Sequence, residues 1–220
     1  MEITWYGISC FRITERGMAT VVTDPYADGL GLGKLKLKAD VVTISHEADG
    51  HDNLGAISGK HRALTSPGEY EIGDVFITGV AVRETRSESG KGKKKKKSER
   101  RNIFFVFDYD GINVAHLGDL DGVPSRAAIE ELAAVDVALV PVGGGSALSP
   151  SQASEVISLI EPSIVVPMHY TTGDEKVDLG SVEPFLSEMG ISDLEPEESL
   201  KVTKTGLTDE TQVVLLKAGG

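Results

Sequence analysis

Short runs of β-branched and aromatic residues, bounded by glycine, proline and aspartate, fill the first part of this chain. Such runs are typical of strands, because branched side chains pack well on a pleated surface and the bounding residues favour turns. We therefore predict strands over Ile3–Gly7, Cys10–Thr14, Thr20–Asp24, Asp40–Ser45, Ala63–Thr65, Glu69–Ile72 and Val75–Val82.

The second part of the chain alternates apolar strand patterns with helical spacing. Strands are predicted over Asn102–Tyr109, Ile112–His116, Val135–Pro141, Ile164–Met168, Val202–Thr205 and Val213–Lys217. Helices are predicted over Pro124–Ala133, Ser149–Ile160 and Leu179–Met189. The second of these helices starts with a serine, a favourable N-cap, followed by proline. A β-rich start followed by strand–helix alternation indicates two sheets covered by helices, within one α/β domain spanning residues 1–220.

A lysine-rich segment from Arg86 to Arg101 interrupts these patterns. It contains no hydrophobic side chain, so nothing in it offsets the entropy lost on ordering, and the like charges of Lys91–Lys97 repel one another. We predict a flexible, solvated loop between two strands. The alternative is a cationic flap that recruits an anionic substrate or a nucleic acid, although no aromatic residue lies among the lysines to stack on bases.

Composition narrows the function classes. The net charge of −12 disfavours general nucleic-acid binding, because a phosphate backbone is bound mainly by cationic side chains. Cys10 is the only cysteine, which excludes an intrachain disulfide and a cysteine-based zinc site. Every apolar run is too short to span a bilayer and the start has no signal-peptide pattern, so we expect a cytoplasmic protein with no membrane partner.

Two histidines, His46 and His51, follow the β-branched run Val41–Ile44. A buried strand that ends in histidine and turns into a loop can direct imidazoles into a cleft. The segment from His46 to His51 resembles the His-x-His-x-Asp-His signature of the metallo-β-lactamase superfamily. In this chain Ala48 stands at the middle histidine of that signature and Gly50 at its aspartate.

Further segments resemble motifs of the same superfamily, in the branch that includes ascorbate-phosphate lactonase-like hydrolases. They follow one another in family order: Tyr6-Gly7-Ile8-Ser9-Cys10-Phe11, Thr23-Asp24-Pro25-Tyr26, Gly68-Glu69-Tyr70-Glu71-Ile72, His116-Leu117-Gly118-Asp119-Leu120, Pro141-Val142-Gly143-Gly144 and Pro167-Met168-His169-Tyr170. The resemblance implies the four-layer αβ/βα sandwich of the superfamily, with two mixed sheets face to face and helices outside. It implies the fold more strongly than a function, because one fold hosts many chemistries.

The resemblance also implies two metal positions, and the first has lost most of its ligands. Relatives use the first two histidines of the signature and a third histidine on a later strand. Here these positions hold His46, Ala48 and a residue near Arg83. Alanine has no donor atom and a guanidinium cannot ligate, so one ligand of three remains, which is too few for zinc.

The second position keeps three of its four ligands. Gly50 replaces the aspartate of the signature, but the last histidine, the bridging aspartate and the final histidine are present as His51, Asp119 and His169. Two imidazoles and one carboxylate with an open position form a recognised catalytic zinc arrangement, so the resemblance implies one zinc ion or none. Asp119 is then also the candidate catalytic residue, because it could orient the attacking water.

Other polar residues of the implied cleft are expected to surround the metal ligands without binding the metal themselves. Asp24 either supports a ligand from behind or caps a turn, and His116 orients the Asp119 loop or a bound ligand. We expect His46 and Arg83 to line the cleft, with the guanidinium paired to Asp119 or to an acidic residue of the signature loop. The acidic residues of that loop could also supply replacement ligands, although their neighbours direct them away from the cleft.

Three functions stay open. The first is a metal-dependent hydrolase of a small, anionic ester, lactone or phosphoester, with at most one intact metal site. The second is a non-catalytic relative that binds a small anion or a partner in the former active-site cleft. The third is a nucleic-acid-processing relative that docks its substrate on Lys91–Lys97. Metal content separates the first from the second, and salt-dependent binding of RNA or DNA tests the third.

Overall fold

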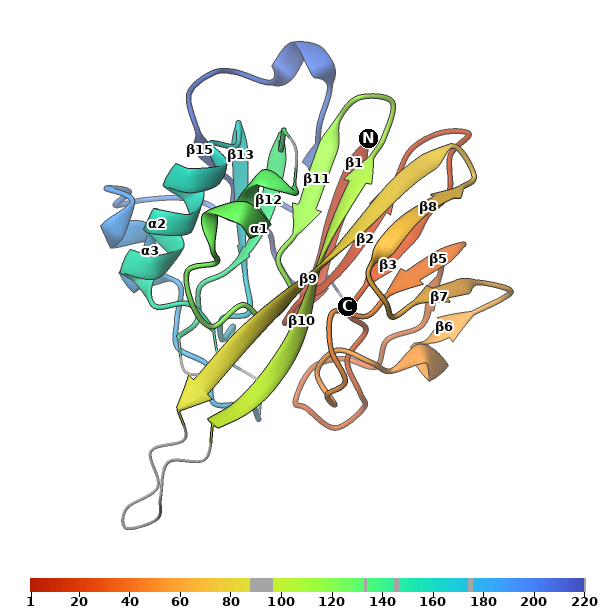
Figure 1. Ribbon diagram of the computed structural model, residues 1–220, viewed down its shortest axis with the longest axis horizontal. Coiled ribbons are helices and arrows are strands. Elements are labelled where there is room, and N and C mark those ends of the chain that lie inside the picture. The colour runs from red at the N-terminus through yellow and green to blue at the C-terminus, as the bar shows by residue number, and fades with distance from the viewer. Residues whose placement is uncertain (88–96, 133, 145–146, 174–175, 220) are drawn as a thin grey trace.

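The computed structural model describes residues 1–87, 97–132, 134–144, 147–173 and 176–219, with the side chains of residues 83–87 and 97–100 outside the description. Within these residues two mixed sheets lie face to face (Figure 1). The first sheet has six strands, in the order β14 (Leu200–Lys201), β1 (Glu2–Gly7), β2 (Cys10–Thr14), β3 (Val21–Thr23), β5 (Val41–Thr43) and β7 (Arg62–Leu64). The second has seven, in the order β15 (Gln212–Val213), β13 (Ile164–Met168), β12 (Val137–Pro141), β11 (Asn113–His116), β10 (Lys97–Asp108), β9 (Val75–Ser87) and β8 (Gly68–Ile72).

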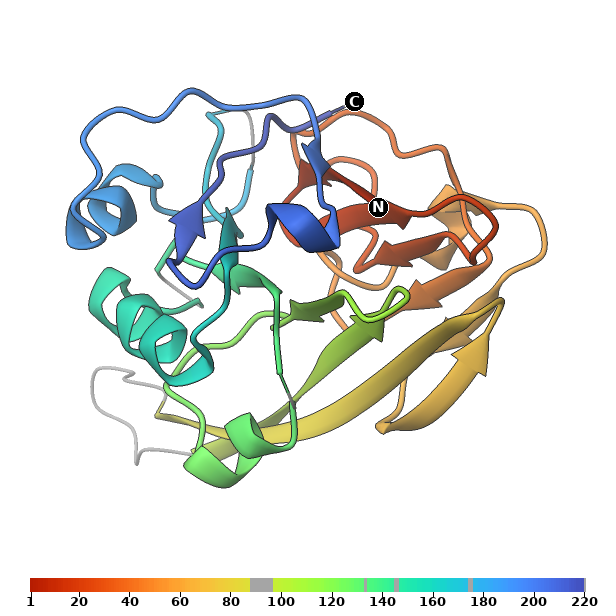
Figure 2. The ribbon, with the colours of Figure 1, turned by 90° about the horizontal axis from the view of Figure 1, so that it is seen from above.

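Helices cover the outer face of the second sheet (Figure 2). They are α1 (Arg126–Glu130), α2 (Pro150–Ile160) and α3 (Glu183–Glu188). Strands β12 and β13 are buried along their whole length, as expected for parallel strands covered on both faces. Helix α2 begins as predicted, because Ser149 is its N-cap and forms a capping box with Gln152. Among the described residues, no helix is both long and apolar enough to cross a bilayer.

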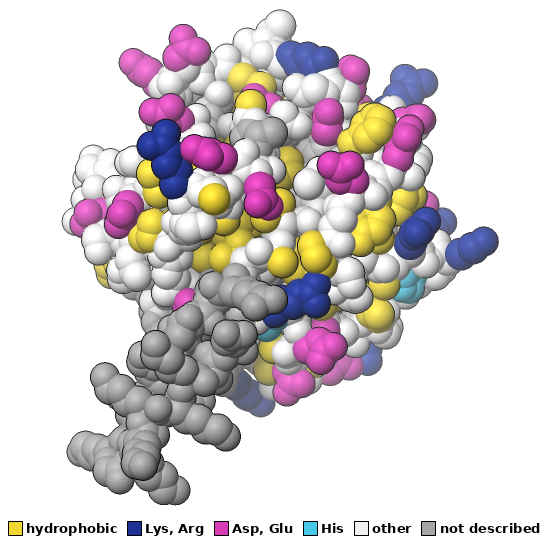
Figure 3. Space-filling model, in the orientation of Figure 1, with side chains coloured by type: hydrophobic (Ala, Val, Ile, Leu, Met, Phe, Trp, Pro, Cys, Tyr) yellow, Lys and Arg dark blue, Asp and Glu magenta, His cyan; other side chains and the backbone are white. Residues whose placement is uncertain are grey.

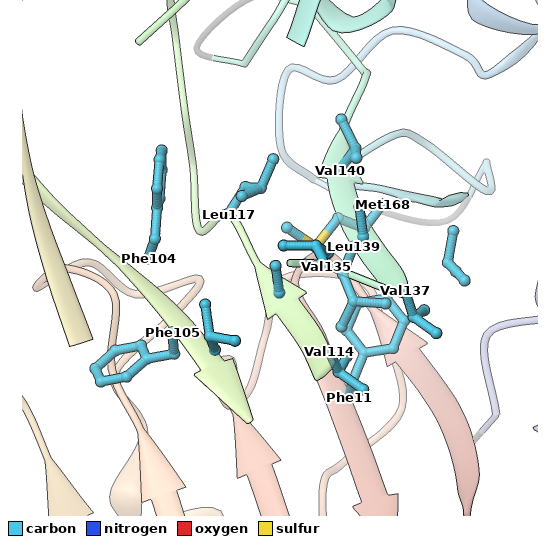
Figure 4. Packing of buried hydrophobic residues seen from close by; sticks show 14 of the residues in the cluster. Phe11, Phe104, Phe105, Val114, Leu117, Val135, Val137, Leu139, Val140 and Met168 are labelled. Carbon is cyan, nitrogen blue, oxygen red and sulfur yellow. The ribbon is translucent and has the colours of Figure 1, made fainter. Parts of the chain in front are cut away.

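The main core lies between the sheets and follows from strand alternation. Val21 of β3 and Val41 of β5 belong to the large buried cluster that also contains the second sheet. Their neighbours Val22 and Val42 belong to a smaller cluster on the outer side of the first sheet. Successive residues of a strand point to opposite faces of the sheet. The two adjacent valines of each strand therefore contribute one side chain to the main core and one to the smaller cluster. Figure 4 shows Phe11 of β2 packing among apolar side chains of the second sheet.

The resemblance implies helices on the outside of the two sheets, but the outer face of the first sheet is covered by a segment without an α-helix. Its cover is the segment between β3 and β7, which contains the 3₁₀-helix η1 (Leu54–Ala56) and the paired strands β4 (Leu37–Lys38) and β6 (Ile57–Ser58). All of this segment is described, and it contains no α-helix. Its apolar side chains, such as Tyr26 and Leu35, nevertheless complete the smaller cluster. Several glycines in the segment disfavour a helix.

Several predicted elements are shorter in the structure, among them the helix predicted over Leu179–Met189 and the strand predicted over Val213–Lys217, and two further regions differ in kind. Strand β9 extends to Ser87 and β10 starts at Lys97, so strand pairing includes both ends of the segment predicted as a loop over residues 86–101. The middle of that segment, residues 88–96, lies outside the described residues. The strand predicted over Val202–Thr205 is wrong, because β14 ends at Lys201 and the 3₁₀-helix η2 (Lys204–Gly206) follows. The ends of β9 and β10 form strands although their polar side chains favour a loop, because the hydrogen bonds between the two backbones stabilise the pairing.

Candidate metal centre

The two sheets bring the ends of their parallel strands to a common edge. Strands β3, β5 and β7 run parallel in the first sheet, and β11, β12 and β13 run parallel in the second. Asp24 follows β3, His46 and His51 follow β5, Asp119 follows β11, and His169 follows β13. Open α/β sheets bind ligands outside the carboxyl ends of their strands, so this edge is the natural place for a site.

His51, Asp119 and His169 form a buried cluster whose ligand atoms all lie within 4.8 Å of one another. Nε2 of His169 is 3.4 Å from Oδ1 of Asp119. The rings of His51 and His169 are stacked, with 5.3 Å between their centroids. These are the three residues that the resemblance names as ligands of the second metal position, and the fold places them side by side.

His46 approaches the other oxygen of the same carboxylate. Its Nε2 is 3.9 Å from Oδ2 of Asp119, and its side chain is only 5% exposed. Its ring centroid lies 4.1 Å from that of His51. The site therefore gathers three imidazoles around one carboxylate, with His46 beside the cluster of His51, Asp119 and His169.

Each of the three imidazoles is held through its Nδ1 atom. The pairs are His51 with Asp24 Oδ2 (2.9 Å), His46 with Ser45 Oγ (3.0 Å) and His169 with Ser9 Oγ (3.1 Å). A carboxylate can only accept, so His51 Nδ1 is the donor. The Ser45 hydroxyl donates its single proton to Asp24 and must therefore accept from His46 Nδ1. In the neutral form of both rings Nε2 is then the unprotonated nitrogen, as in metal sites where an outer partner fixes the tautomer.

Asp24 is the centre of this hydrogen-bond network. Its buried carboxylate accepts from the Ser45 backbone N–H at 2.7 Å, from the Ser45 hydroxyl and from His51. Burial would raise the pKa of Asp24, but the hydrogen bond from His51 and the nearby imidazoles lower the pKa below its ordinary value. Asp24, His46 and His51 also form a second cluster of possible ligand atoms. A metal ion there would displace these hydrogen bonds, so the cluster around Asp119 fits a metal better.

Three residues of the site have left-handed backbone conformations: Ile8 (φ 50°), Asp24 (φ 38°) and His169 (φ 55°). Residues with side chains adopt such conformations rarely, at a cost of about 1–3 kcal/mol each, and keep them only where surrounding structure enforces them. Here the backbone N–H of His169 donates to the carbonyl of Ile8 at 2.8 Å, which joins two of the strained residues across the two sheets. These backbone conformations set the direction in which the Asp24 and His169 side chains leave the chain.

His116 supports the site without belonging to either cluster. Its Nε2–H donates to the carbonyl of Ser9 at 2.9 Å, and its Nδ1 accepts from the backbone N–H of Gly118 at 3.2 Å. Burial lowers the pKa of His116, although the charge of Asp24 opposes this, and the imidazole stays neutral as both hydrogen bonds require. His116 thus contacts the backbone of the loop that carries Asp119, and its orienting role stays a prediction.

Sequence reasoning missed three buried polar residues of the site, Ser9, Ser45 and Asn102. The Asn102 amide donates to the carbonyl of Leu117 at 2.9 Å and accepts from the backbone N–H of Asp119 at 3.3 Å. The two serines hold imidazole rings, as described above. In the sequence these residues are visible only as polar residues beside an apolar run or a motif histidine. That pattern is too common to identify a supporting residue without knowledge of the packing.

No further candidate ligand comes from the other residues predicted near the cleft, as far as the structure describes them. These residues are Arg83, Glu47 and Asp49. Arg83 lies on β9 opposite Arg101 of β10, and its side chain is outside the described residues. Its predicted pairing with Asp119 therefore stays a prediction. Glu47 and Asp49 are exposed and belong to neither cluster of possible ligand atoms.

We expect Asp24→Asn to weaken zinc binding by about 10- to 100-fold, the usual effect of changing an outer partner of a metal ligand. Asparagine keeps the shape, but one carboxylate oxygen becomes an NH₂ donor and faces the donors from Ser45 and His51. Zinc titration against a competing chelator measures the change. Asp28→Asn is the matched control, because Asp28 is an exposed partner of Lys34. An unchanged affinity in Asp24→Asn would contradict the positioning role.

Comparisons with known proteins agree with the motifs and the geometry. A family model described as a beta-lactamase superfamily domain matches residues 2–169. A UPF0173 protein of Pyrococcus abyssi is 30% identical, over 92% of this chain and 100% of that protein. A UPF0173 metal-dependent hydrolase of Pelotomaculum thermopropionicum is 28% identical over the same shares. Among solved structures, a proposed Zn-dependent hydrolase of the metallo-beta-lactamase superfamily from Thermotoga maritima has a TM-score of 0.76 and 34% identity, covering 98% of this chain and 97% of that one.

Proposed function

This chain belongs to the metallo-β-lactamase superfamily and, within it, to the UPF0173 family of metal-dependent hydrolases, and on that premise we propose that it is a hydrolase that works with one metal ion. The observation that carries the proposal is the buried cluster of His51, Asp119 and His169. Two imidazoles and a carboxylate converge there, and hydrogen bonds at Nδ1 hold both rings in place.

The donor set fits zinc. Zinc accepts imidazole nitrogen and carboxylate oxygen, and catalytic sites combine three protein ligands with one open position. His51, Asp119 and His169 would hold the ion. Asp24 and Ser9, behind the two imidazoles, are the kind of outer partner that such sites use. The Thermotoga maritima relative, itself a proposed Zn-dependent hydrolase, favours the same metal.

We propose one metal ion because the other position of the superfamily lacks donors in this chain. Ala48 has no donor atom, and the position of the third ligand falls near Arg83, whose guanidinium cannot ligate. Of the signature residues for that other position only His46 lies near Asp119, at 3.9 Å. The sequence motifs further favour the branch of ascorbate-phosphate lactonase-like hydrolases, which adds lactones and phosphoesters to simple esters as substrates.

The chemistry is attack by water on an electrophilic carbon or phosphorus. When bound, a metal ion would supply Lewis acidity and lower the pKa of water toward neutrality. Asp119 orients the water through its carboxylate. His46 is hydrogen-bonded to Ser45 through Nδ1 and lies with its Nε2 near Asp119, where the neutral imidazole accepts the proton of the water. The same proton then passes to the leaving oxygen, while the water oxygen stays on the carbon or phosphorus.

Metal analysis combined with an activity assay tests the proposal. Protein purified without chelator or added metal is expected to bind one zinc ion per chain, and to hydrolyse p-nitrophenyl esters, a simple lactone or a phosphodiester. Dialysis against a chelator should abolish the activity and zinc should restore it. His61→Ala, outside both clusters, is expected to retain both properties. Zinc binding without hydrolysis would favour the alternative of a non-catalytic anion-binding relative, and failure to bind metal would contradict the proposal.

A further inference from the structure

A cavity of about 560 Å³ opens beside His46. His46 is part of its lining, so the cavity adjoins the cluster around Asp119. Its volume lies within the range of about 300–1,000 Å³ that small-molecule sites occupy. A substrate whose reactive group reaches Asp119 can therefore extend into this space.

The walls of the cavity follow from strand geometry. Ile44 and Thr65 line it from just beyond the carboxyl ends of β5 and β7. Arg101 and Ile103 line it from β10. These two residues are two apart and therefore share a face of the strand, whereas Asn102 between them points the other way and holds the turn of Asp119. One strand thus contributes both to the support of the site and to the cavity.

The lining combines apolar contact with a single cation. Ile44, Leu54 and Ile103 supply apolar side chains. Arg101 is the one Lys or Arg among the described lining residues, in a protein of net charge −12 whose acidic side chains are spread over the face in Figure 3. A guanidinium keeps its charge at every accessible pH and binds carboxylate or phosphate with two hydrogen bonds.

The carboxylates in the same lining form no close ion pair with this arginine in the described part of the chain. Glu47 and Asp52 also line the cavity, from the loop that carries the histidines. Among the described residues, no ion pair within 4.0 Å joins either carboxylate to Arg101. Their negative charge disfavours an anion at the loop wall, so an anionic group is directed to Arg101 on the β10 wall.

We propose that this cavity selects the substrate: an ester, lactone or phosphoester that carries a second, anionic group separated from the reactive bond by a short apolar spacer. Arg101 binds the carboxylate or phosphate, and Ile44, Leu54 and Ile103 contact the spacer. The proposal rests on the hydrolase function proposed above, since it assumes that the reactive bond lies at the cluster around Asp119.

Two nitrophenyl esters and one charge-removing variant test this selectivity. Mono-p-nitrophenyl glutarate carries a free carboxylate, whereas p-nitrophenyl butyrate is neutral. Wild type is expected to favour the glutarate ester in kcat/KM. Arg101→Gln should reduce that preference by about tenfold or more, mainly through KM, because one charge-assisted hydrogen-bonded contact is lost. Arg62→Gln, an exposed arginine on β7 outside the cavity, is the matched control and should keep the preference. An unchanged preference in Arg101→Gln would overturn the proposal.

Equilibrium binding separates a failure of this proposal from a failure of the hydrolase function. Glutarate binding to the zinc-treated protein, measured by calorimetry, should weaken by about tenfold or more in Arg101→Gln and stay unchanged in Arg62→Gln. If wild type cleaves none of the esters, the lactone or the phosphodiester but binds glutarate through Arg101, the hydrolase function fails and the anion pocket stands. If wild type does not bind glutarate, or binds it equally without Arg101, the pocket is overturned whatever the activity.

Discussion

Replacing Asp119 by asparagine is expected to weaken zinc binding by more than about a hundredfold and to abolish zinc-dependent hydrolysis. This loss exceeds the one expected for a residue that only holds a metal ligand from behind. Asparagine has nearly the shape of aspartate, and the hydrogen bond from the Asp119 backbone to Asn102 does not depend on the side chain. The variant lacks the negative charge, however, and an amide oxygen is a poorer zinc ligand than a carboxylate. The loss therefore reports on the chemistry of the ligand and not on packing.

A competition titration against a coloured chelator measures the zinc affinity, and thermal unfolding checks the fold. Asp110→Asn is the matched control, because the Asp110 side chain is 90% exposed and lies 3.7 Å from Lys204. The Asp119 side chain is only 4% exposed, so removing its charge should leave the metal-free protein equally stable or more stable. Wild-type zinc affinity in Asp119→Asn would contradict the assignment of the cluster. A large loss of stability would point to a structural role instead.

The candidate ligands could be predicted from the sequence because metal chemistry restricts the residue types and strand patterns restrict their places. His46 follows a run of β-branched residues, and His169 follows another. Runs of this kind predict strands with little ambiguity, and parallel strands present their carboxyl ends at one edge. The order of the family motifs then indicated which histidines share that edge. The fold class and the two mixed sheets follow from the same information.

The supporting residues could not be predicted because they depend on contacts between distant segments. Ser9 holds His169 across 160 positions of sequence, and no local pattern connects the two. Asn102 appears in the sequence only as a polar residue at the start of an apolar run, although its side chain fixes the turn of Asp119. The packing of the cover on the first sheet also depends on such contacts, since apolar residues in a glycine-rich segment can pack without forming a helix.

Gly118→Ala is expected to destabilise the protein by about 3 kcal/mol, and to weaken zinc binding with it. The backbone of Gly118 has φ +62°, a conformation that costs a residue with a Cβ roughly 1–2 kcal/mol. A Cβ there would also lie 2.2 Å from Oδ1 of Asn102 and 2.7 Å from Cβ of Ser45. Overpacking of this kind typically costs about 1–3 kcal/mol more. Both neighbours are fully or almost fully buried, so neither can move into solvent.

The contacts explain why the effect should reach the metal centre. Asn102 holds the backbone of Asp119, and Ser45 holds the ring of His46, so relieving the clash by moving either residue displaces a group of the cluster. Thermal unfolding should show a decrease in Tm of roughly 6–12 °C for a domain of this size, and the zinc titration should show weaker binding. Gly122→Ala is the matched control, since a Cβ at Gly122 meets nothing within 4 Å. It should change stability by no more than about 0.5 kcal/mol. A Gly118→Ala protein as stable as the control would show that the Asp119 turn can rearrange freely, and the rigid support inferred for the site would have to be abandoned.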